Sequence, residues 1–380
     1  MIKKLTITAI CIALLFSLAA CAGGAAATPF SSEKPWGMFA TYAYERCEYS
    51  VKVYARAKVD GKWTDGGLLT TEDSRFCQTL NASGTGKNAV ATVDSTLLIE
   101  WLDNAAAAEN AGKADKVSST VTFSTVTMAP VNSQKTAEFA TRKDADGKDY
   151  NNSYTLAVDY DKLAGQIEFT QKKDADATKS HPVKKDIPIK PGAKFDNEQL
   201  FYLLRAYKSL VPGGSASFNV ANPVENYARA DSGLFSMSAT AHEPSNAYRY
   251  LPVGDYFKDF IYDVDVGGTP IPSLALETEP KAEDPPKNKI WGDYALEGDA
   301  FAVKCMPVLL RLSETEPGPA HIIHFTDPGL MFKTGADGIA TSKLIVRYEY
   351  TVYDLSNGAT GDEQFRYEYT LIDYSTRRGA

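Results

Sequence analysis

Alternation of apolar and polar residues runs through most of the chain and predicts β-strands. In 48–54, Glu-Tyr-Ser-Val-Lys-Val-Tyr, every second residue is apolar, as in a strand with one buried face. The same alternation returns in 120–128, 154–160 and 166–170. Asp60-Gly61 and the segment 161–165 follow such strands and favour hairpin turns. The pattern therefore predicts a mainly β fold with many antiparallel neighbours.

One segment has the spacing of an amphipathic helix instead. Asp196 can cap its N-terminus, and Gln199 follows three residues later, as in a capping box. Its apolar face carries Leu200, Leu203, Leu204 and Tyr207. We therefore expect an α+β fold in which one principal helix, near 196–209, lies against a large curved antiparallel sheet, a half-barrel or a sandwich. The same apolar face is our candidate surface for an apolar ligand.

The C-terminal region contains two similar strands. Arg-Tyr-Glu-Tyr-Thr-Val-Tyr-Asp at 347–354 is followed by Arg-Tyr-Glu-Tyr-Thr-Leu-Ile-Asp at 366–373, with turn-forming residues between them. Paired antiparallel, these strands place their tyrosines in a ladder on the core face and their Arg and Glu residues on the face toward water. One repeated hairpin is too little for a solenoid.

The N-terminus has the three parts of an export signal. Lys3 and Lys4 precede an apolar run, 5–18, which ends in Leu18-Ala-Ala-Cys21. The run is too short for an ordinary membrane-spanning helix. Leu18-Ala-Ala-Cys21 resembles the lipobox of bacterial lipoproteins, which implies removal of the signal peptide, 1–20, and lipid attachment to Cys21. The alternative is an ordinary secretory signal cut elsewhere. Ala22 after the cysteine implies the outer membrane if the cell has two membranes.

The remaining chain divides into a tether and a body. Residues 21–34 are small and polar and predict a lipidated cysteine with a flexible tether. A β-rich body, 35–380, follows either as one unit or as two halves, 35–190 and 191–380. Removing Lys3 and Lys4 from 40 basic side chains leaves 38 against 48 acidic ones, a formal charge of −10. Such a chain is a poor partner for nucleic acid, and lipid on Cys21 is its expected link to the membrane.

Three cysteines remain in the body. Cys47 and Cys77 both lie in the first block of strands and form our candidate disulfide, since exported proteins meet oxidising conditions. Cys305 alternates with apolar residues in 301–306 and is expected to point into the core. Three free thiols are the alternative.

No catalytic, metal or cofactor motif stands out. His321 and His324 are three apart in a β-branched run, and on a strand they point to opposite faces, so they cannot hold one metal ion. The segment 144–149, Asp-Ala-Asp-Gly-Lys-Asp, lacks the complete ligand spacing of a calcium loop and favours a turn. We therefore expect no metal, no cofactor and no enzymatic activity.

The segment 196–206, set among long strands, resembles β-rich bacterial envelope proteins, similar in outline to the periplasmic carriers of lipoproteins. This resemblance implies a half-barrel that closes over helices and holds acyl chains. We expect an extracytoplasmic, lipid-anchored protein with a binding or structural role, whose ligand is a lipid or another apolar molecule. Two alternatives stay open: a hydrolase with loop-borne catalytic residues, and a surface module that recognises carbohydrate or a protein partner.

Overall fold

The computed structural model describes the protein in segments separated by gaps. These segments are 29–31, 43–104, 109–143, 147–170, 183–189, 194–222, 234–241, 248–252, 287–288, 292–293, 296–297, 300–312, 321–326, 339, 341–354 and 362–378. Strands dominate them, and a short helix accompanies a large, almost wholly antiparallel sheet. The predicted fold class is confirmed.

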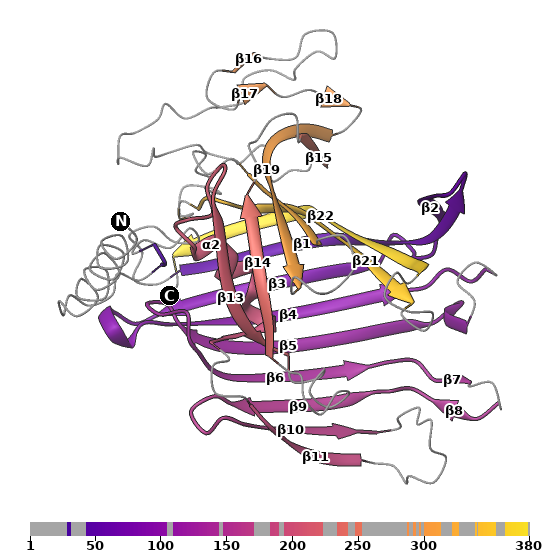
Figure 1. The fold of residues 1–380 in the computed structure, drawn as a ribbon, viewed down its shortest axis with the longest axis horizontal. Coiled ribbons are helices and arrows are strands. Elements are labelled where there is room, and N and C mark those ends of the chain that lie inside the picture. Colours follow the sequence, from indigo (N-terminus) through magenta and orange to yellow (C-terminus); the bar gives the residue numbers. More distant parts are fainter. Residues whose placement is uncertain are drawn as a thin grey trace, which may run out of the picture.

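One arm of the sheet comes from the first half of the chain (Figure 1). Each neighbouring pair in it is antiparallel. In spatial order the strands are β1 (Ala43–Val59), β3 (Arg75–Ser83), β4 (Val90–Glu100), β5 (Ala114–Ser124), β6 (Pro130–Glu138), β9 (Tyr154–Asp159), β10 (Ala164–Phe169) and β11 (Val183–Pro188). The two predicted hairpins are confirmed: β2 (Lys62–Leu68) returns along β1 after Asp60-Gly61, and β10 returns along β9.

The other arm continues from the opposite edge of β1. Its strands, in spatial order, are β22 (Asp362–Arg378), β21 (Ile345–Asp354), β20 (His321–Thr326), β19 (Ala300–Leu312), β14 (Leu234–Ala241) and β13 (Ser215–Ala221). A short strand, β12 (Phe195–Asp196), pairs parallel with β13. In Figure 1, β13, β14 and β19 cross in front of β3, β4 and β5 at a steep angle, so the sheet turns back over itself. Because β1 pairs with β22, the two predicted halves share one sheet.

Smaller elements complete the described fold. β15 (Tyr248–Pro252) and β18 (Leu296–Glu297) pair with β19, β16 (Lys287–Asn288) pairs with β17 (Gly292–Asp293), and β7 (Arg142–Lys143) pairs with β8 (Asp149–Tyr150). The 3-10 helix η1 (Gly86–Asn88) lies between β3 and β4. A second one, η3 (Asn197–Gln199), runs directly into helix α2 (Leu200–Ala206).

The main core lies between the two arms. In β1, Val51 and Val53 are buried, whereas the alternate side chains on the outer face are half-buried or exposed. Leu203 and Leu204 of α2 have no exposed surface and belong to the same core cluster as residues from both arms. Full burial of one leucine side chain contributes roughly 1.5–3 kcal/mol to folding. The helix therefore fixes how the arms pack together.

The predicted capping box is present, but the helix is shorter than expected. The Asp196 carboxylate accepts a hydrogen bond from the Glu198 N–H at 2.7 Å, and Gln199 completes the box. The helix ends at Ala206, and Tyr207 is already extended. The prediction carried the helix to 209 because Tyr207 continues the apolar spacing. In the structure that tyrosine forms a β-bridge with Phe30.

The repeated C-terminal strands pair as predicted. Tyr348 lies opposite Tyr369 and Tyr350 opposite Tyr367, and the last two rings stack with their centroids 4.8 Å apart. On the other face, Arg347 and Arg366 form ion pairs with glutamates of both strands. The predicted ladder of tyrosines on one face and of Arg and Glu residues on the other is therefore confirmed.

The predicted disulfide between Cys47 and Cys77 is wrong. Both thiols are free. Cys47 lies opposite Gln78, and Cys77 lies opposite Glu48. Since directly opposed residues share a face of the sheet, the two thiols point to opposite faces. Cys305 lies on β19, opposite Thr326.

Candidate functional site

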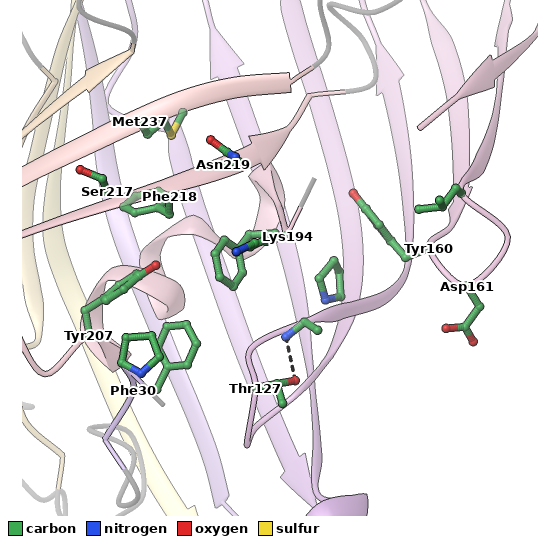
Figure 2. Close-up of a pocket in the computed structure, with 15 residues that line it drawn as sticks. Phe30, Thr127, Tyr160, Asp161, Lys194, Tyr207, Ser217, Phe218, Asn219 and Met237 are labelled. Carbon is green, nitrogen blue, oxygen red and sulfur yellow. Dashed lines mark hydrogen bonds between the residues drawn. The ribbon is translucent and has the colours of Figure 1, made fainter. Parts of the chain in front are cut away.

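A pocket of about 750 Å³ opens beside the end of helix α2 (Figure 2). One wall comes from the turns that follow β5 and β9, and the other comes from β13 and β14. The segment that leads into α2, the residue that ends it and the described N-terminal residues close the base. The pocket thus lies where the two arms and the helix meet.

Four aromatic rings form its apolar base, which we call the aromatic floor: Phe30, Phe195, Tyr207 and Phe218. Phe30 meets Tyr207 at 4.8 Å and Phe195 at 5.8 Å between ring centroids. Tyr207 stacks on Phe218 at 5.4 Å. Each residue is at most 6% exposed. Rings that brace one another in this way present a fixed apolar surface.

The residues Pro29 to Ser31, which we call the N-terminal strap, hold Phe30 in place. The Ser31 N–H donates to the carbonyl of Ala206 at 2.9 Å, and the Lys208 N–H donates to the carbonyl of Pro29 at 3.0 Å. Phe30 is only 3% exposed. The prediction of a flexible tether is therefore wrong for these three residues, because one aromatic ring in a stretch of small residues finds an apolar site on the body.

A buried polar cluster stands behind the pocket. Tyr160, which lines the pocket, donates its hydroxyl hydrogen to the carboxylate of Asp196, which is 1% exposed. Burial and the charge of Asp196 raise the pKa of Tyr160, and burial raises the pKa of Asp196. Since Asp196 also caps the helix, this bond ties the pocket wall to the start of η3 and α2.

Glu198, at the start of the helical segment, is also bound by polar side chains of the sheet. Glu198 accepts hydrogen bonds from Lys135 at 2.7 Å and from Ser119 at 2.8 Å. Burial by itself raises the pKa of Glu198, but the Lys135 ammonium outweighs it, and the pKa is lowered. These polar contacts fix the position of the helix on β5 and β6.

Two charged side chains, Lys194 and Asp161, lie at the pocket, and both are exposed. In Figure 2, Lys194 lies next to the aromatic floor, whereas Asp161 lies at the far side with its carboxylate turned away. Thr127 also lines the pocket, and its hydroxyl accepts the Ala129 N–H at 3.3 Å. The arrangement can surround an apolar body and place one cation beside it.

Of the predicted ligand-contacting residues, only Tyr207 lines the pocket. Leu203 and Leu204 are fully buried, and Leu200 packs at the edge of the same core. This pocket therefore does not use the three leucines: Leu203 and Leu204 belong to the core, and Leu200 is half-buried at its edge. Sequence reasoning missed the three phenylalanines of the aromatic floor, Phe30, Phe195 and Phe218. For Phe30, the one available signal was that it is the single aromatic residue of the segment 21–34.

The two histidines of β20 point to opposite faces, as predicted. His321 lies on the tyrosine face, where its Nδ1 is 2.7 Å from the Tyr348 hydroxyl and its ring stacks on Tyr350. His324 lies on the other face, 3.5 Å from Glu349. Burial lowers the pKa of His321 to about 4. Within the described segments, no group of three metal-ligating side chains occurs.

Two further sequence predictions fall partly or wholly outside the described residues. Cys21 and the signal peptide, 1–20, lie outside them, as do residues 144–146 of the calcium-like segment. At the end of that segment, Gly147 has a positive φ of 76°, and Asp149 forms an ion pair with Lys143 at 2.9 Å. Gly147 and Lys148 thus lie in the turn before β8, which begins at Asp149.

No family model matches the chain, and no curated protein matches it. Among the described residues, no helix combines the length and apolar character needed to cross a membrane.

Proposed function

We propose that this protein is an extracytoplasmic lipoprotein, anchored through Cys21, that holds an apolar ligand in the pocket above the aromatic floor. The observation that carries the proposal is the pocket itself: about 750 Å³ with four mutually packed aromatic rings at its base. Pockets for small molecules are typically about 300–1,000 Å³ and mostly apolar, with a few polar groups.

The rigidity of the site supports binding. Phe218 lies on β13, Tyr207 directly follows α2 and stacks on Phe218, and the strap is hydrogen-bonded to the residues on either side of Tyr207. The wall residue Tyr160 is tied to a buried carboxylate. A preformed apolar surface costs little ordering when a ligand arrives.

The strap also supports a site close to the membrane. Cys21 and Pro29 are eight residues apart in sequence. At 3.3–3.6 Å per residue, a fully extended segment of that length spans about 26–29 Å. With lipid on Cys21 and Pro29 bound to the body, the pocket stays within reach of the bilayer surface. A ligand from that membrane then has a short path.

The first test is displacement of a fluorescent fatty acid from the body, 22–380, made without its anchor. Ala129 is exposed and lines the pocket, so Ala129→Trp fills the cavity without entering the core. We expect at least tenfold weaker binding, about 1.4 kcal/mol.

Val126→Trp is the matched control. Val126 lies in the same turn and is 41% exposed, and it is not a lining residue of the pocket. This variant is expected to bind like the wild type. If both variants bind equally well, or if the wild type does not bind, the proposal that this pocket holds the ligand is refuted.

A further inference from the structure

The charges around the pocket are uneven. Lys194 directly precedes Phe195 of the aromatic floor, and its side chain is exposed. In the part of the chain that the structure describes, no carboxylate forms an ion pair with Lys194. The neighbouring hairpin turn differs, because there Lys162 is paired with Asp159 at 2.6 Å. One unpaired ammonium group thus stands at the edge of an apolar surface.

The pocket's acidic residue does not cancel this charge. Asp161 lies across the pocket from the aromatic floor, and in Figure 2 its carboxylate points away from Lys194. The chain as a whole carries an excess of acidic residues, with a formal charge of −8. An anionic group is repelled by most of this acidic protein, but it is attracted to a local cation such as Lys194.

We propose that the ligand is an anionic amphiphile with one apolar chain, such as a fatty carboxylate or a single-chain phosphate ester. Its apolar chain lies against Phe195, Tyr207 and Phe218, and its anionic head lies at Lys194. This proposal rests on the proposed apolar-ligand function and adds the charge and the orientation of the ligand.

The test compares probes of equal chain length, by isothermal titration with the body 22–380. The probes are palmitate, hexadecanol, hexadecylamine and hexadecyl phosphate, each below its aggregation concentration. We expect both anions to bind more tightly than the alcohol, and the amine to bind most weakly. The relative affinities of carboxylate and phosphate identify the head group. If none of the probes binds, the apolar-ligand function itself fails. If all bind equally, only the inference about charge fails.

Variants locate the charge effect. Lys194→Gln is expected to weaken palmitate about three- to fivefold, as for a solvent-exposed ion pair, and to leave hexadecanol unchanged. Asp161→Asn is expected to bind palmitate at least as tightly as the wild type. Lys116→Gln, at an exposed position on β5 that does not line the pocket, is the control and should behave like the wild type.

Two outcomes with the variants would also overturn the inference. One is unchanged palmitate binding by Lys194→Gln. The other is an equal loss of palmitate binding in Lys194→Gln and Asp161→Asn, because opposite changes in charge would then have the same effect and pocket shape would explain both.

Discussion

Helix α2 is joined to β1 by a buried ion pair. Removal of one partner should destabilise the fold strongly, and removal of both partners should destabilise it less. Arg205 and Glu45 are 2% and 0% exposed. The guanidinium binds the carboxylate with both Nη atoms, and the Nη2–Oε2 distance is 3.0 Å. Thr341 donates to the same carboxylate at 3.0 Å and accepts from Arg205 at 2.8 Å. Neither charge has access to bulk water.

Removal of one partner leaves the other charge buried and uncompensated, which costs about 3–5 kcal/mol. We therefore expect Glu45→Leu and Arg205→Met each to lower the free energy of unfolding by that amount. Replacing both residues removes the stranded charge. The double variant Glu45→Leu/Arg205→Met should be at least about 2 kcal/mol more stable than either single variant, although Thr341 loses its hydrogen bonds to both residues.

The assay is equilibrium urea denaturation of the body 22–380, followed by far-ultraviolet circular dichroism and tyrosine fluorescence. Coincident transitions justify the free-energy comparison. Single variants that lose less than about 1 kcal/mol would refute the buried pair as described. A double variant whose loss equals the sum of the two single losses would show that the two residues act independently, contrary to the geometry.

Two further predictions concern pH. His321 has a pKa of about 4 in the folded state and about 6.5 when unfolded, so it is protonated first in the unfolded chain. The stability of the wild type relative to His321→Phe should therefore fall by about 2 kcal/mol from pH 7.5 to pH 5, and a constant difference in urea melts would contradict the burial of His321. Burial beside Arg205 lowers the pKa of Lys343 to about 8, so the unfolded state holds more protons than the folded state between pH 8 and 10.5. The free energy of unfolding of the wild type should therefore rise by about 2 kcal/mol relative to that of Lys343→Met from pH 7 to pH 9.5. A difference that stays constant with pH would refute the pKa shift.

Local patterns predicted much of the fold because their causes are local. The alternation in β1, the Asp60-Gly61 turn and the capping box of Asp196 and Gln199 all appear as expected. The pairing of tyrosines between β21 and β22 could also be predicted, because two similar strands separated by turn-forming residues are expected to pair as a hairpin.

The site was harder to predict because it depends on tertiary register. An apolar helical face suits a ligand or a core equally well, and only the returning arm of the sheet assigns Leu203 and Leu204 to the core. Likewise, the register of β1 against β3 decides that Cys47 and Cys77 face apart. Phe30 belongs to no periodic pattern, so its place in the aromatic floor could not be derived from the sequence.

The most direct test of ligand binding is native mass spectrometry of the purified body 22–380 after incubation with palmitate. We predict one bound palmitate in the wild type and in Val126→Trp, and the mass of the ligand-free chain in Ala129→Trp. A ligand-free wild type, or equal occupancy in all three proteins, would contradict a ligand site above the aromatic floor.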